Sequence, residues 1–146
     1  WGENLHPTRL TPDEQYTHIS LWSLLSAPLL LGCDLSKLDD FTLNLLTNDE
    51  VLAIDQDPLG KEARQVLKKD SLQVWVKDLK GGTKAVGIFN MSKRNQTIDL
   101  NWRDINLNGR FKVRDLWRQK DLGLFADKFS PFIPSHGCTL IKVSGK

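Results

Sequence analysis

Cysteine, methionine and tyrosine are scarce in this chain of 146 residues, which has two cysteines, one methionine and one tyrosine. Cys33 and Cys138 lie far apart and form neither a disulfide framework nor a CxxC motif. Free cysteine is among the most buried residue types, so we expect two buried thiols, with a Cys33–Cys138 bridge as the alternative. The three histidines are scattered, and the sequence predicts no metal site.

Long apolar runs and a leader pattern are also absent. No run reaches the roughly 18–20 apolar residues that a bilayer span needs, so we expect no membrane partner. No N-terminal signal pattern is visible. With 40% hydrophobic and 26% charged residues, the composition excludes a disordered chain. The first residue is Trp1 rather than Met, which indicates a processed or truncated product.

Each half of the chain has fewer charges of one sign than of the other, although the net charge of the whole is only +2. Residues 1–60 hold two basic and ten acidic residues, and residues 61–146 hold eighteen basic and eight acidic ones. A basic half could bind nucleic acid, but no known nucleic-acid-binding motif accompanies it. Lys112 and Arg114 alternate with apolar residues on a predicted strand, so we interpret them as a solvated outer face and expect no nucleic-acid partner.

The first part of the chain has the pattern helix, strand, helix. A capping box of Thr11 and Glu14 starts a helix that we expect to end near Ser26. Further helices are expected over residues 41–46 and after Asn48.

The leucines at residues 29–31 lack polar alternation, which is typical of a strand covered on both faces in a parallel sheet. Such a strand needs neighbours for its backbone groups, because each unpaired buried group costs about 1–3 kcal/mol. Residues 1–61 are therefore interpreted as the end of a larger α/β domain.

After residue 60 the hydrophobic period changes to two. Strands are expected at residues 72–77, 85–90, 97–100, 111–117, 122–132 and 139–143. Gly81 and Gly82 suit the positive φ angles of a hairpin turn. About six strands at ten-residue spacing are typical of an antiparallel sandwich, which we assign to residues 62–146.

Two long segments resemble glycoside hydrolase family 27, the family of the α-galactosidases (melibiases). The run YTHISLWSLLSAPLLLGCDL at residues 16–35 is similar to the family's last barrel helix and strand. The run NDEVLAIDQDPLG at residues 48–60 is similar to its final barrel helix and the exit from it. Three shorter segments resemble parts of the family's C-terminal β domain and occur in the same order as in that domain. They are residues 74–75, 113–117 and 134–137.

The resemblance implies a β-rich α+β fragment: the terminal part of a (β/α)8 barrel, followed by an antiparallel β-sandwich. It also implies a retaining glycosidase that removes terminal α-linked galactose without a cofactor. Some relatives cleave α-N-acetylgalactosamine or β-L-arabinopyranose. The family's Lys-Tyr-Asp nucleophile motif and its acid/base Asp do not occur here, so we assign no catalytic residue and expect the chain alone to be inactive. The alternative is a non-catalytic β-sandwich module for carbohydrate binding or subunit association.

Four residues are candidates for substrate binding on the barrel rim. Asp34 follows the predicted strand, so in a barrel it would lie at the face where active sites are built. Gly32 and Cys33 lie beside it, and a cap for the following helix is the alternative role for Asp34. Trp1 is the fourth candidate, because its ring could stack on galactose.

Partners and location follow from the same resemblance. A galactoside is the expected substrate of the full-length enzyme, and secretion, the periplasm or the lysosome are the expected locations, with any signal peptide upstream. Self-association through the apolar surface of residues 1–60 is expected if the chain folds alone.

Trp102 could be exposed on the β domain as a sugar-binding surface. Asn90 and Asn95 each begin an N-glycosylation pattern, which often occurs by chance.

Overall fold

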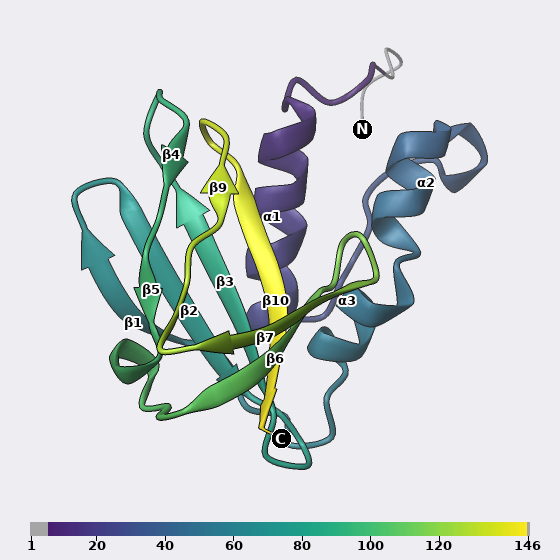
Figure 1. The fold of residues 1–146 in the computed structure, drawn as a ribbon. Helices are drawn as coiled ribbons and strands as arrows, with labels where there is room; N and C mark the ends of the chain where they lie inside the picture. Colours follow the sequence, from purple (N-terminus) through teal and green to yellow (C-terminus); the bar gives the residue numbers. More distant parts are fainter. Residues whose placement is uncertain (1–5, 146) are drawn as a thin grey trace.

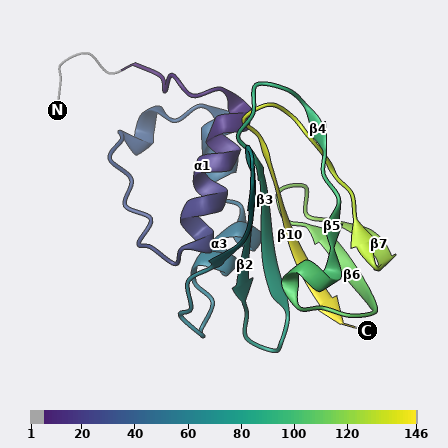
Figure 2. The same cartoon turned by 90° about the vertical axis from the view of Figure 1, so that its left-hand side faces the viewer.

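The chain folds into three layers, with a central sheet between a group of helices and a set of short strands. The computed structural model describes residues 6–145 (Figure 1). In chain order the elements are α1 (Pro12–Leu24), η1 (Leu35–Lys37), α2 (Asp40–Leu46), α3 (Asp49–Asp55), β1 (Arg64–Lys69), β2 (Leu72–Asp78), β3 (Lys84–Asn90), β4 (Gln96–Thr97), β5 (Leu100–Asn101), η2 (Trp102–Ile105), β6 (Arg110–Asp115), β7 (Lys120–Ala126), β8 (Lys128–Phe129), β9 (Phe132–Ile133) and β10 (Cys138–Gly145). Figure 2 shows α1 and α3 on one side of the sheet and β4 and β5 on the other.

The main sheet has six strands in the order β1-β2-β3-β10-β6-β7. Every neighbouring pair is antiparallel. Two small antiparallel pairs, β4 with β9 and β5 with β8, lie over one face of it. This arrangement confirms the β-rich α+β class with a β-sandwich. The strand β1 was not expected from the sequence, because charged residues surround its two apolar positions, Val66 and Leu67.

The central strands of the main sheet are buried on both faces, and β3 accordingly carries buried side chains at successive positions, whereas the edge strands β1 and β7 are mostly exposed. Ile88 belongs to a core under the short strands, and its neighbour Phe89 belongs to a second core under the helices. Leu24 of α1 is part of this second core. Residues 6–61 and 62–145 therefore share this second core, and the division of the chain into the domains 1–61 and 62–146 stays a prediction.

Local capping sets the helix starts, as the sequence predicts. Glu14 accepts a hydrogen bond from the backbone N–H of Thr11 at 2.8 Å, and the Thr11 hydroxyl accepts one from the Glu14 N–H at 3.3 Å. The side chain of Asn48 caps α3 by accepting from the Val51 N–H at 3.1 Å. Each cap satisfies a backbone donor that the helix leaves unpaired, so these boundaries depend on nearby residues alone.

The expected strand at residues 29–31 is wrong: these residues form no strand in the structure. Leu30 is 79% exposed and Leu31 is 42% exposed. A strand exists only where a second strand pairs with it, and no strand of residues 6–145 lies against this segment. The apolar run therefore forms an irregular segment that is largely exposed, in which the Leu30 N–H donates to the Pro28 carbonyl at 2.9 Å.

Two expectations about single residues are also corrected, the exposed position of Trp102 and the burial of Cys33. Trp102 is only 1% exposed and lies in the core under the short strands, where its Nε1 donates to the Phe125 carbonyl at 3.1 Å. It therefore offers no ring to a sugar. Cys33 is exposed and Cys138 is half-buried, and both are free thiols. Burial raises the pKa of the Cys138 thiol to about 11.

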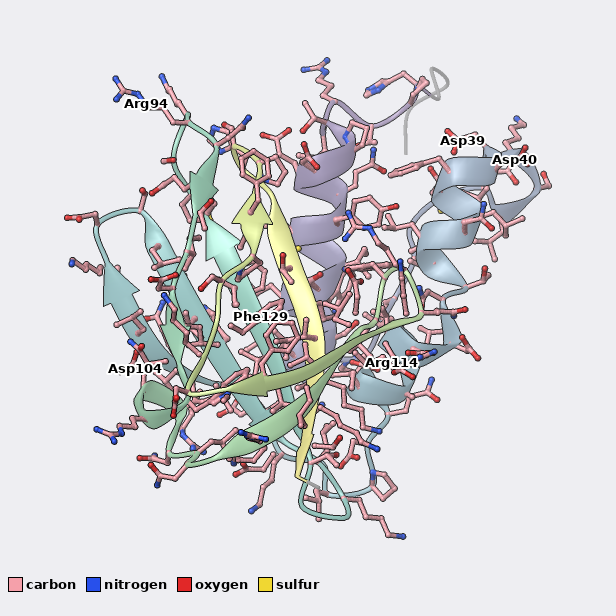
Figure 3. The ribbon with its side chains drawn as sticks, in the orientation of Figure 1. Asp39, Asp40, Arg94, Asp104, Arg114 and Phe129 are labelled. Atoms are coloured by element: carbon pink, nitrogen blue, oxygen red, sulfur yellow. The ribbon has the colours of Figure 1, made fainter. Side chains whose placement is uncertain are left out.

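Arg114 lies in the interface between the layers rather than on a solvated outer face. Its Nε donates to Glu50 Oε2 of α3 at 2.8 Å, and its Nη1 donates to Asp121 Oδ1 at 3.0 Å (labelled in Figure 3). The hydrogen bonds to Glu50 contribute most to raising the pKa of this guanidinium. The alternating pattern identified its strand face correctly but could not show that an acidic helix covers it.

Lys77 of β2 is fully buried where α1 and α3 end against the sheet. Its Nζ donates to the Ser26 hydroxyl and to the Ile54 carbonyl at 2.5 Å each, and to the Ser23 carbonyl at 3.4 Å. A cation at this point interacts favourably with the negative ends of both helix dipoles. One ammonium group thus joins two helices to the sheet.

Asp55, the last residue of α3, lies near this cation, but its carboxylate is in an unfavourable environment. Its buried Oδ1 has no hydrogen-bond partner among the described residues, and burial raises its pKa despite the nearby Lys77 charge. Because the folded pKa is raised, the folded state binds the extra proton, and this contribution to stability is lost as the pH rises through the folded pKa. A negative charge at a helix C-terminus is unfavourable as well.

The substitution Asp55→Asn is therefore expected to raise the free energy of unfolding by up to about 1 kcal/mol at pH 7, measured by urea denaturation. The matched control is Asp57→Asn, because Asp57 accepts from the Leu59 and Lys80 N–H groups at 3.1 Å. The control should lose stability. Equal losses in both variants would contradict this account of Asp55.

Candidate functional site

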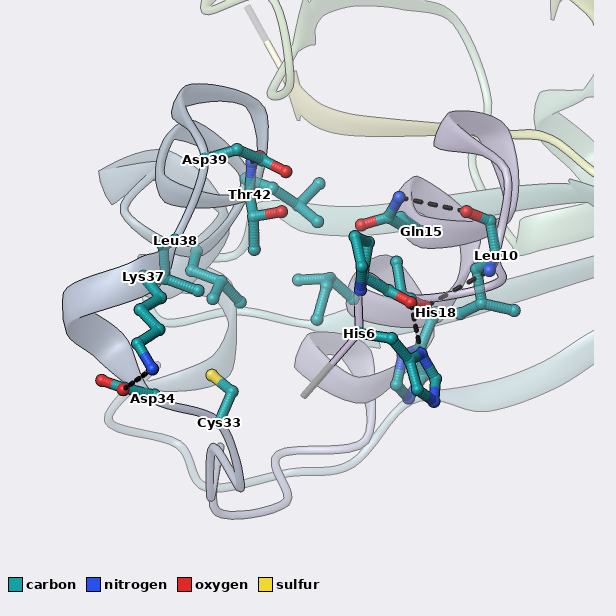
Figure 4. Close-up of a pocket in the computed structure, with 15 residues that line it drawn as sticks. His6, Leu10, Gln15, His18, Cys33, Asp34, Lys37, Leu38, Asp39 and Thr42 are labelled. Carbon is teal, nitrogen blue, oxygen red and sulfur yellow. Dashed lines mark hydrogen bonds and ion pairs between the residues drawn. The ribbon is translucent and has the colours of Figure 1, made fainter. Parts of the chain in front are cut away.

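A pocket of about 520 Å³ lies between α1 and the segment that carries the predicted rim residues (Figure 4). The chain before α1, α1 itself, residues 33–39 and α2 form its walls. Its polar lining consists mainly of His6, Gln15, His18, Asp34, Lys37 and Asp39. A hollow of this size with several polar groups has the dimensions of a small-ligand site.

Asp34 faces this pocket from a turn that it organises itself. Its Oδ1 accepts from the Ser36 N–H at 3.1 Å and from the Ser36 hydroxyl at 2.7 Å, which caps η1. Its Oδ2 lies 3.5 Å from Lys37 Nζ. The Ser36 hydroxyl, the Ser36 N–H and the Lys37 ammonium together hold the pKa of Asp34 below its ordinary value. The capping role considered for Asp34 is present in the structure.

Asp39 is the second carboxylate on the pocket wall and caps α2. Its Oδ1 accepts from the Thr42 N–H at 2.6 Å, and this bond lowers the pKa of the carboxyl. A general acid needs a raised pKa so that it still holds its proton at neutral pH. Asp34 and Asp39 are both ionised at neutral pH. They can therefore accept hydrogen bonds from hydroxyl groups but cannot protonate a leaving group.

The four predicted rim residues have different positions. Cys33 and Asp34 line the pocket. Gly32 lies next to them in the chain but does not line it, and open space surrounds the position of its missing Cβ. Trp1 lies outside the described residues.

Several pocket residues were not identified from the sequence. His6, Gln15 and His18 reach the pocket because the start of α1 packs beside residues 33–39. Gln15 Nε2 donates to the Leu10 carbonyl at 3.2 Å, and the His18 ring lies 5.4 Å from that of Trp22. No spacing rule brings His18 and Asp34 together, since their approach depends on tertiary packing.

Neither a metal-binding cluster nor a membrane-spanning helix occurs within residues 6–145. Within residues 6–145, no three His, Cys, Asp or Glu side chains lie close enough together to hold a metal ion. None of the helices in that range has the length and apolar character that crossing a membrane requires.

Comparison with known proteins gives matches to both parts of the chain. A family model described as the alpha galactosidase C-terminal beta sandwich domain matches residues 69–143, and one described as alpha galactosidase A matches residues 7–57. The probable alpha-galactosidase of Dictyostelium discoideum is 41% identical over 141 residues, which are 92% of this chain and 37% of that protein.

Solved structures agree with the sequence matches. Alpha-galactosidase I from Mortierella vinacea has a TM-score of 0.90 at 29% identity, over 94% of this chain and 36% of that one. A GH27 β-L-arabinopyranosidase from Geobacillus stearothermophilus has a TM-score of 0.91 at 35% identity, over 96% of this chain and 32% of that one. The chain spans about a third of the length of these relatives.

The fold and the two matches define a class of glycosidases in which a C-terminal β-sandwich follows the barrel. The chain belongs to glycoside hydrolase family 27, the α-galactosidase family. The resemblance inferred from residues 16–35 and 48–60 is thereby confirmed.

Proposed function

We propose that this chain forms the last barrel segment and the β-sandwich of a retaining glycosidase that removes terminal α-linked galactose. The observation that carries the proposal is that both family matches occur in order along one chain, with Cys33 and Asp34 on a polar pocket of the first matched part. In this role Asp34 accepts hydrogen bonds from sugar hydroxyls. Gly32 and Trp1 are further rim candidates.

The chemistry itself is assigned to residues outside this chain. A retaining glycosidase needs a carboxylate nucleophile and a carboxylic acid about 5–5.5 Å apart. The two carboxylates of the pocket cap η1 and α2 and stay ionised. Residues 1–146 alone are therefore proposed to be inactive on glycosides.

The exposed leucines of the helical layer support a role as part of a larger barrel. Leu30, Leu31, Leu35 and Leu43 are between 42% and 79% exposed. Contact with preceding barrel elements would bury them, and so would self-association of residues 1–60. A sedimentation coefficient that rises with protein concentration would identify the second case.

A chimera tests the proposed function. The part of the Dictyostelium relative that precedes the matched region, fused to residues 7–146, is expected to release p-nitrophenol from p-nitrophenyl α-D-galactopyranoside. Residues 1–146 alone should give the rate of buffer. In the chimera, Asp34→Asn should raise KM about tenfold, the effect of losing one hydrogen bond to substrate.

Asp40→Asn is the matched control, because Asp40 is exposed on α2 and does not line the pocket. It should leave KM unchanged. The p-nitrophenyl β-L-arabinopyranoside, assayed in parallel, tests the alternative substrate that the Geobacillus relative suggests. A folded chimera that is inactive on both glycosides would contradict the proposal, as would activity of residues 1–146 alone. A saturable, millimolar affinity of the inactive chain for galactosides would favour a carbohydrate-binding module.

A further inference from the structure

Two N-glycosylation patterns occur within eight residues of one another, and the structure gives their asparagines opposite environments. The first is Asn90-Met91-Ser92 and the second is Asn95-Gln96-Thr97. Both flank the start of β4, next to the turn before β10; Arg94, between them, is labelled at the upper left of Figure 3.

Asn90, the last residue of β3, is fully buried and uses both ends of its amide. Its Nδ2 donates to the carbonyls of Arg94 at 2.8 Å, Pro134 at 3.0 Å and Ile133 at 3.2 Å. An N-glycosidic bond would remove one of the two amide hydrogens and place a sugar where these carbonyls lie. A chain that carries a glycan on Asn90 cannot adopt this fold.

Asn95 is exposed, and only one end of its amide is engaged. Its Oδ1 accepts from the Ser135 N–H at 2.9 Å, which fixes the side chain, and its Nδ2 has no hydrogen-bond partner within residues 6–145. The third residue of the pattern, Thr97, is exposed on β4, where alternation places it on the same side as Asn95.

The surface beside Asn95 also fits a sugar. Thr97 pairs directly with Phe132 of β9, and residues directly opposite in an antiparallel pair share a face. Phe132 is 65% exposed, whereas its neighbour Ile133 is fully buried. The first sugar on Asn95 would have an aromatic ring within reach for its apolar C–H face, and it would cover a side chain that otherwise faces water.

We infer that Asn95 is the acceptor of an N-linked glycan and that Asn90 is not glycosylated in the folded protein. The donor is a polyprenyl-pyrophosphate-linked oligosaccharide that begins with N-acetylglucosamine. The Nδ2 atom forms a bond to the anomeric carbon, the bond from that carbon to the pyrophosphate oxygen breaks, and polyprenyl pyrophosphate leaves. The displaced amide proton passes to a base of the transferase. No oxidation or reduction takes place.

Translation of residues 1–146 behind a cleavable signal peptide into endoplasmic-reticulum microsomes tests this inference. We expect one mobility shift that endoglycosidase H removes, both in the total chain and in its trypsin-resistant folded fraction. Asn95→Gln and Thr97→Ala should lose the shift, and Thr97→Ser should keep it. Ser92→Ala, which removes the first pattern without replacing Asn90, should also keep it.

Three outcomes would overturn the inference. One is a wild-type chain without any shift. Another is a shift that survives Asn95→Gln and disappears in Ser92→Ala. The third is a second shift in the trypsin-resistant fraction that depends on Ser92, since it would place a glycan on Asn90 in the folded state. The total chain is read in every variant, so a variant that folds poorly still reports whether its pattern was used.

Discussion

The substitution Asn90→Asp is expected to lower the free energy of unfolding by about 3–5 kcal/mol at pH 7, which is enough to unfold a marginally stable domain. The new carboxylate has the shape of the amide but lacks its donor group, and it would face the carbonyl oxygens of Arg94, Ile133 and Pro134. Burial of an unpaired charge among acceptors is among the largest single-residue effects known. Urea denaturation followed by tryptophan fluorescence measures the loss.

Asn95→Asp is the matched control. Its Oδ1 still accepts from the Ser135 N–H, and the added charge faces solvent. The control should stay within about 0.5 kcal/mol of the unchanged chain. If Asn90→Asp were equally mild, the hydrogen bonds of Asn90 would not hold β3 to the turn before β10.

Replacing Lys77 with methionine is expected to cost about 2–4 kcal/mol of unfolding free energy. Methionine fills a similar space, but it leaves the acceptors at the ends of α1 and α3 without their buried donor. The loss should include helical signal in circular dichroism at urea concentrations that leave the sheet intact, because Lys77 joins the helices to the sheet. Lys80→Met is the control, since Lys80 is exposed in the hairpin turn.

The difference in unfolding free energy between the unchanged chain and Lys77→Met is expected to increase with pH. Burial lowers the pKa of Lys77 from 10.5, and Asp55 and Asp57 offset the effect only in part. Between the folded pKa and 10.5, the unfolded chain binds more protons, so the contribution of Lys77 to stability increases with pH in that window. The stability difference between the unchanged chain and Lys77→Met should therefore widen as the pH approaches 10.5. A constant difference would contradict the lowered pKa.

Features that depend on neighbouring residues could be predicted from the sequence. The capping box of Thr11 and Glu14, the cap at Asn48 and the glycine turn before β3 all occur where expected, because each is decided within a few residues. The strand expected at residues 29–31 fails for the opposite reason, since pairing requires a distant partner. Trp102, which we expect on an exposed sugar-binding surface, is buried by the short strands, which are also brought over it by distant pairing.

The candidate site could be predicted only where one segment supplies it. Cys33 and Asp34 follow one another on the pocket wall and were identified from their position after an apolar run. His6, which precedes α1, and His18 of α1 line the pocket wall opposite Asp34, and the ion pair of Glu50 with Arg114 joins residues 64 positions apart. These contacts arise from the packing of helices on the sheet, which no local pattern encodes.

β10 is the last strand of the described chain to be synthesised, and it occupies the middle of the main sheet. It pairs with β3 on one side and β6 on the other. On the ribosome, β1 to β3 can form hairpins as soon as they emerge, and so can β6 and β7, but within the main sheet only Cys138–Gly145 joins β3 to β6. A nascent chain that stalls earlier would present two open strand edges at once. Such edges are templates for pairing with other chains, so aggregation is a hazard until β10 has been synthesised.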